Sequence, residues 1–227
     1  WQDTAKVVVD PTQDSICELL AHKCVDKDIY YRIIESGQLS DYYLVSNFPT
    51  DNTNNAHSLN PSIAIDNNDV VYIVWADNID YVGAGSDDYD IFAHSFSNGV
   101  ILEEPQTAYG MISHQTQSPS DESSELPDAI ILPDNTLFVA WSERDEGVVN
   151  IKTARIFSTI GGALMFDEPA FNSDTSGIST NISVLVDAAF NLHMLWQDNT
   201  TIDVSDIVQP GSGNVDDDIF YSVSPLE

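Results

Sequence analysis

A tryptophan followed two positions later by an acidic residue recurs along this chain of 227 residues. The copies are Trp1-Gln2-Asp3, Trp75-Ala76-Asp77, Trp141-Ser142-Glu143 and Trp196-Gln197-Asp198, and they contain all four tryptophans. Chance placement would scatter the tryptophans over unrelated positions. Recurrence of one motif along a chain is the mark of a repeat architecture, so we expect several copies of one structural unit.

A second motif follows each tryptophan motif after a polar stretch. Its copies are Asp28-Ile29-Tyr30-Tyr31, Asp90-Ile91-Phe92-Ala93, Asn150-Ile151-Lys152-Thr153 and Asp218-Ile219-Phe220-Tyr221. The segments between turns are short and rich in Val, Ile, Tyr and Phe, as in residues 70–75 and 136–141, which is typical of β-strands. We predict a unit of four strands, A to D, in which the tryptophan motif ends strand B and the second motif opens strand C. The expected D strands are residues 42–48, 100–108 and 163–171.

Units of this kind, spaced by roughly 55 to 75 residues, predict an all-β fold, namely a β-propeller of four-stranded antiparallel blades. Residues 1–227 would form one domain of about four units, approximately 1–56, 57–110, 125–172 and 178–227. The first unit lacks strand A and most of strand B, and the last lacks strand D. We therefore expect the chain to be part of a longer one or to be completed by neighbouring chains. A β-sandwich is the alternative, although it would not require the motif to recur at one place in each unit.

The pattern that runs from Pro61 to Asp77, followed by Asp90-Ile91-Phe92-Ala93 and a Ser/Gly turn, resembles the sialidase-like (BNR-repeat) propellers. This resemblance covers nearly the whole chain and implies a secreted or cell-surface protein. The family's Asp-box is degenerate here, because residues 95–99 keep its Ser and Gly but neither its Asp nor its Trp. Sialidases use three convergent arginines to bind the substrate carboxylate. This chain has only Arg32, Arg144 and Arg155, of which the first and last fall in expected C strands, so sialidase activity is not expected.

The charge is strongly acidic, with 37 Asp and Glu against 7 Lys and Arg and a net charge of −30. This balance excludes nucleic-acid and anionic-membrane partners, which need a basic surface. The acids gather in the expected B–C loops, at residues 4–27, 78–89, 144–149 and 199–217, and at the ends of the flanking strands.

Neighbouring antiparallel strands should bring the acid that ends strand B close to the acid that opens strand C. Such carboxylates repel unless a cation or hydrogen-bond donors intervene, and Ca²⁺ accepts six to eight oxygen ligands from flexible loops. The candidate calcium ligands are Asp77, Asp87, Asp88, Asp90, Asp198, Asp216, Asp217 and Asp218. In the alternative interpretation, the aspartates cap turn amides and keep the surface soluble.

The only two cysteines, Cys17 and Cys24, would form a disulfide in an oxidising compartment, or else stay free thiols. Asn181 and Asn199 each open a glycosylation sequon. Together these features favour an extracellular or cell-surface location.

We therefore predict a non-catalytic extracellular module for adhesion or assembly, stabilised by calcium and joined to neighbouring chains through its incomplete end blades. The alternative is a glycan-binding lectin or a glycoside hydrolase that uses the B–C loop face, since paired carboxylates can hydrolyse glycosides.

Overall fold

The computed structural model describes residues 6–8, 28–46, 57–78, 88–97, 100–101, 112–113, 123–145, 148–157, 165–167, 178–199 and 218–225. In these ranges every regular element is a β-strand, so the predicted all-β class is confirmed. Within the same ranges, no helix is long and apolar enough to cross a membrane.

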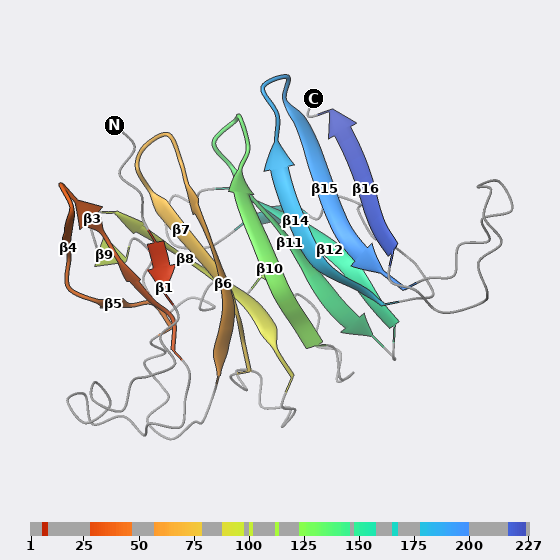
Figure 1. The fold of residues 1–227 in the computed structure, drawn as a ribbon, viewed down its shortest axis with the longest axis horizontal. Coiled ribbons are helices and arrows are strands. Elements are labelled where there is room, and N and C mark those ends of the chain that lie inside the picture. The colour runs from red at the N-terminus through yellow and green to blue at the C-terminus, as the bar shows by residue number, and fades with distance from the viewer. Residues whose placement is uncertain are drawn as a thin grey trace, which may run out of the picture.

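The strands form successive antiparallel sheets that follow the order of the chain (Figure 1). The first sheet has the order β1-β2-β5, with β1 (Lys6–Val8), β2 (Tyr30–Arg32) and β5 (Tyr43–Leu44). The second has the order β6-β7-β8-β9, with β6 (Ser58–Ile65), β7 (Val71–Asp77), β8 (Asp90–Ser97) and β9 (Val100–Ile101). The third has the order β10-β11-β12-β13, with β10 (Ser123–Ile131), β11 (Leu137–Asp145), β12 (Val148–Phe157) and β13 (Met165–Asp167). The last has the order β14-β15-β16, with β14 (Ser179–Val186), β15 (Asn191–Asp198) and β16 (Asp218–Pro225).

A separate two-stranded hairpin, β3 (Ile34–Glu35) and β4 (Gln38–Leu39), lies between β2 and β5 in the sequence. Its two-residue loop is Ser36-Gly37, with φ values of 49° and 77°. Positive φ at both positions matches the twist of a tight hairpin and favours Gly.

The register of the first sheet corrects the place of the first tryptophan motif. Strand β1 falls inside the segment expected to be the first B–C loop, and Val8 pairs with Tyr30. In the other sheets Trp75 pairs with Phe92, and Trp196 with Phe220. Val8 therefore holds the tryptophan's place in the first sheet, and Trp1 lies outside the described residues. Pairing with strand C sets this position, and a β-branched Val suits a strand as well as Trp does.

The sheets stack face to face, and the core lies between them. We call the face of a sheet that packs on the next sheet along the chain its front, and the face that packs on the preceding sheet its back. The front of the second sheet, with Tyr72, Val74 and Ile91, packs on the back of the third, with Val139 and Trp141. The first and second sheets, and the third and last, pack in the same way. Trp75 is fully buried on the back of the second sheet and stacks on Phe92, so the recurrent tryptophan is a core residue.

Polar side chains join the innermost strands β6, β10 and β14, which lie side by side (Figure 1). The Ser62 hydroxyl donates to Asp128 Oδ1 at 2.9 Å and accepts from the Ala129 amide at 3.1 Å. Asp128 Oδ2 in turn accepts from the Val184 amide at 2.9 Å. Strands β6 and β10 thus each present a side-chain acceptor to an edge amide of the next sheet.

His94 is buried on the back of the second sheet, where its ring lies edge-on to Trp75 with centroids 5.1 Å apart. Burial lowers the pKa of His94 from 6.5 to about 4. The imidazole is therefore neutral in the fold at pH values at which the unfolded chain protonates it.

We expect His94 to make the fold acid-sensitive. Because the folded pKa lies below the unfolded one, the free energy of unfolding should fall as the pH drops from 6.5 toward 4, by about 3 kcal/mol. Urea unfolding across this range, compared with His94→Phe, measures the contribution, since Phe keeps an aromatic ring but takes no proton. If the free energy of unfolding depends on pH in the same way in both proteins, His94 does not make the fold acid-sensitive.

Candidate functional site

The structure places two of the predicted acid pairs directly opposite each other. Asp77 at the end of β7 pairs with Asp90 at the start of β8, and Asp198 pairs with Asp218 across β15 and β16. Asp88 lies just before β8 and is partly exposed. Asp87, Asp216 and Asp217 fall outside the described residues, as do Cys17 and Cys24.

The described carboxylates at these strand ends accept hydrogen bonds from serines. Asp77 is buried and accepts from Ser58 Oγ at 2.6 Å, and Asp198 is buried and accepts from Ser179 Oγ at 2.5 Å. Each bond ties an innermost strand to the end of the strand beside it. Asp90 accepts from Ser113 Oγ at 2.9 Å. Ser58 and Ser179 hold equivalent positions, because each pairs with the acid that ends the neighbouring strand. This recurrence is visible in the sequence but was not part of the predicted motifs.

The spacing of the tryptophan motif has a physical reason. Residues two apart in a strand point to the same face, so the indole reaches the acid that follows it. Trp75 Nε1 donates to Asp77 Oδ2 at 3.1 Å, and Trp141 Nε1 donates to Glu143 Oε2 at 3.2 Å. The acid thus satisfies an indole N–H that burial would otherwise leave unpaired.

Within the part of the chain that the structure describes, no group of three or more His, Cys, Asp or Glu side chains could hold a metal ion. The donors to Asp77, Asp90 and Asp198 agree with the alternative interpretation, in which the aspartates accept local hydrogen bonds. Calcium binding by the loops between these strands stays a prediction.

Both sequon asparagines stand where the second sheet also has asparagine. Asn199 Oδ1 accepts from the Ile178 amide at 2.7 Å, as Asn78 Oδ1 accepts from the His57 amide at 2.5 Å. Asn181 has a φ of 53° at a register shift of β14, as Asn60 has a φ of 52° in β6. Asparagine tolerates this left-handed conformation better than most residues. These local roles account for the asparagines, and glycosylation of either stays a prediction.

The most unusual surface of the described structure is the front of the last sheet. It includes the apolar side chains of Leu185, Leu195, Ile219 and Val223, together with the rings of His193 and Tyr221. Leu195 is 44% exposed, Ile219 67% and Tyr221 60%. The residues at the same positions on the front of the second sheet, Val74, Ile91 and Ala93, are 0%, 0% and 3% exposed. A set of positions that forms core elsewhere in the chain is thus open to solvent here.

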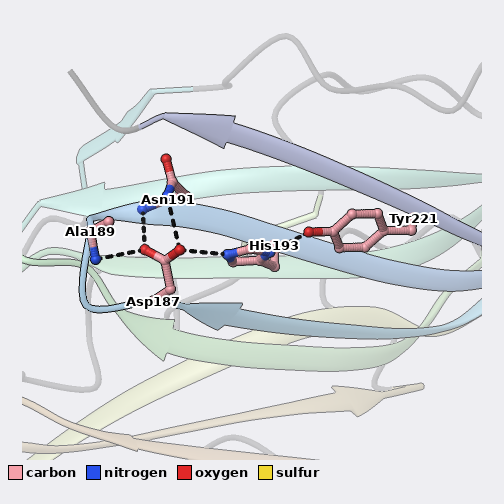
Figure 2. Close-up of polar contacts among 5 residues, drawn as sticks. All are labelled: Asp187, Ala189, Asn191, His193 and Tyr221. Atoms are coloured by element: carbon pink, nitrogen blue, oxygen red, sulfur yellow. Dashed lines mark hydrogen bonds and ion pairs between the residues drawn. The ribbon is translucent and has the colours of Figure 1, made fainter.

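A polar network crosses this face (Figure 2). His193 Nε2 lies 3.0 Å from Asp187 Oδ2, and Nδ1 lies 2.6 Å from the Tyr221 hydroxyl. An ionised carboxylate can only accept, so Nε2 donates to Asp187. In the neutral imidazole, Nδ1 then accepts from Tyr221. This network orients the ring and the phenol against each other on the sheet surface.

Asp187 also organises the turn between β14 and β15 (Figure 2). Its Oδ2 accepts from the Asn191 side chain at 2.8 Å, and its Oδ1 accepts from the Asn191 and Ala189 amides at 2.9 and 2.8 Å. The bonds from Asn191, followed by the bond from His193, hold the pKa of Asp187 well below its usual range.

We expect Asp187 to contribute stability that disappears in acid. A carboxyl with a lowered folded pKa stabilises the fold above its unfolded pKa, about 3.9, and this contribution is lost as the pH falls further. Asp187→Asn should therefore differ most from the wild type above about pH 4 and approach it below. Urea unfolding of both proteins along this pH range tests the point, and a difference that does not change with pH would refute it. His94 titrates in both proteins and cancels in the comparison.

No protein-family model and no curated protein matches this chain. Among solved structures, the chain is similar to an endo-arabinase from Bacteroides thetaiotaomicron VPI-5482, with a TM-score of 0.43 and 15% sequence identity. The alignment covers 89% of this chain and 66% of the arabinase chain. Similarity at this level assigns neither a fold nor an activity.

Proposed function

We propose that this chain is a non-catalytic module of β-propeller type that acts in assembly, through the exposed front of its last sheet. The observation that carries the proposal is the contrast between Leu195, Ile219 and Tyr221 and their buried equivalents in the second sheet. Exposed contiguous apolar patches mark interaction surfaces in soluble proteins. The strand pairing and face-to-face packing support the propeller-type arrangement, because each sheet packs on the next through the same positions.

The buried acids argue against a catalytic role for the strand ends. A glycosidase carboxylate must reach the scissile oxygen, whereas Asp77 and Asp198 are buried and hydrogen-bonded to serines. A lectin or a glycoside hydrolase on the B–C loop face would have to use other residues of those loops.

The setting that we propose is extracellular or at a cell surface, with calcium held by the acidic loops. The extracellular setting rests on the sequons and the two cysteines, and calcium rests on the density of aspartate in the loops. Both belong to the proposal and follow from sequence patterns.

We expect the isolated chain to self-associate as its concentration rises, because the exposed face finds a second apolar surface. Leu195→Asp should weaken the association at least about tenfold, since a charge buried without a partner costs more than the 1.4 kcal/mol that a factor of ten represents. Sedimentation velocity over a concentration series measures both effects. Leu39→Asp is the matched control, because Leu39 is also exposed but lies on the β3–β4 hairpin. A wild type that stays monomeric at every concentration, or an unchanged Leu195→Asp, would overturn the proposal.

A further inference from the structure

The contact between the second and third sheets has two polar parts besides its apolar core. In the first part, the Ser62 hydroxyl of β6 accepts a hydrogen bond from the Ala129 amide and donates one to Asp128 of β10. In the second part, the turn after β10 is hydrogen-bonded to the turn after β6. Asn135 Nδ2 donates to Asp66 Oδ2 at 3.0 Å, and Asn135 Oδ1 accepts from the Asn67 amide at 2.9 Å.

The last sheet carries the same two acceptors on its exposed front. Ser183 pairs with Leu195 as Ser62 pairs with Val74, so the two serines hold the same place. Asp187 opens its turn as Asp66 does. Asp66 Oδ1 accepts from the Asn68 and Val70 amides, both at 2.8 Å, in the pattern that Asp187 Oδ1 shows with Ala189 and Asn191.

The third sheet keeps an acceptor at the serine position, where Asp128 receives the Val184 amide, but it differs at the turn. The acidic turn is therefore not a general feature of the unit. It has Leu132 where the second and last sheets have Asp66 and Asp187. The last sheet, which covers the third, has Phe190 where the third has Asn135. An acidic turn is thus covered by a sheet with a turn asparagine, and an apolar turn by a sheet with Phe190.

On the last sheet, His193 occupies the carboxylate oxygen of Asp187 that corresponds to Asp66 Oδ2. In the second sheet, that oxygen of Asp66 is bound by the third sheet. Asp66 Oδ2 receives Asn135 Nδ2, whereas Asp187 Oδ2 receives His193 Nε2. His193 stands on β15 where the second sheet has Tyr72, a residue of the covered front. An incoming turn asparagine would compete with the imidazole for Asp187.

We infer that the front of β14–β16 is the docking surface for a four-stranded antiparallel sheet of the β10–β13 type. Its innermost strand donates an amide to Ser183, its turn asparagine donates to Asp187 in place of His193, and its apolar back covers Leu195, Ile219 and Tyr221. This inference rests on the proposed assembly function and names the partner of that face.

A second copy of the chain fits this description less well. Its β10–β13 sheet is already covered on the back by its own second sheet. On the back of its first sheet, Tyr30, which holds the place of Phe92, is only 7% exposed. The occupant is therefore a partner sheet of the β10–β13 type and not a sheet of a second copy of this chain.

The test appends a second copy of residues 114–172, which contain β10–β13, to the C-terminus of the full chain through a flexible linker. Ser62 Oγ and Asp128 Oδ1 are 2.9 Å apart in the contact that is being copied. Ser183→Cys combined with Asp128→Cys in the appended copy should therefore form an intramolecular disulfide. Asp134→Cys in the appended copy, paired with the same Ser183→Cys, is the control, because Asp134 lies in the turn after β10 and not beside Ser62. Absence of the first disulfide, or equal yields from the two pairs, would overturn the inference.

Hydroxyl-radical labelling of Tyr221 in the extended chain without added cysteines gives an independent readout. We expect labelling to fall to the level of residues on the covered front of the second sheet. If Tyr221 stays accessible in the dilute extended chain and becomes protected only as that chain self-associates through Leu195, the occupant is a second copy. The inference then fails although the assembly function stands. If neither the original nor the extended chain responds to Leu195→Asp, the assembly function itself fails.

Discussion

The structure depends on how the inner edge of each sheet is satisfied. An edge strand has a row of backbone amides without strand partners, and an unpaired buried amide costs about as much as a lost hydrogen bond. Here the side chain of the preceding innermost strand supplies the missing acceptor. Ser62 caps the Ala129 amide, and Asp128 caps the Val184 amide. These hydrogen bonds fix how far one sheet is shifted along its strands relative to the next. The apolar side chains of the two facing surfaces then pack at equivalent positions in each pair of sheets.

The same device gives the stack a direction. The second sheet presents its acceptor to the third, and the third presents its own to the last, so the front and back of a unit are not interchangeable. The last sheet ends this series with Ser183, Asp187 and a set of apolar side chains that are open to solvent. Its exposed face is therefore a copy of an interface that the chain has already used, and the proposed function and its partner both follow from this copy.

Much of the fold could be predicted from the sequence, because composition and spacing report strand pairing. The Asp90 motif does open strand β8, and Trp75, Trp141 and Trp196 lie near the ends of paired strands. The first unit misled the prediction because Trp1 matches the motif in letters, whereas Val8 holds the place in the pairing. The expected D strands were also longer than β9 (Val100–Ile101) and β13 (Met165–Asp167) as the structure describes them.

The candidate site was harder to predict, because its meaning depends on which face of a strand is covered. The density of aspartate predicted a site in the loops. The aspartates that the structure describes at the strand ends instead accept hydrogen bonds from serines such as Ser58 and Ser179. No periodicity distinguishes Leu195 from Val74, since both belong to the same position of the repeat. Only the packing shows that one is core and the other is surface.

Backbone amide hydrogen exchange at Ala129 and Val184 tests the central claim most directly. If side chains of the preceding sheet cap the inner edges, both amides should exchange as slowly as the ladder amides of β11. Asp128→Ala should then release Val184 more than Ala129, because the Val184 amide loses its only described acceptor. The Ala129 amide loses Asp128 Oδ1 but keeps Ser62 Oγ. Fast exchange of both amides in the wild type, at the rate of an open edge strand, would contradict the account.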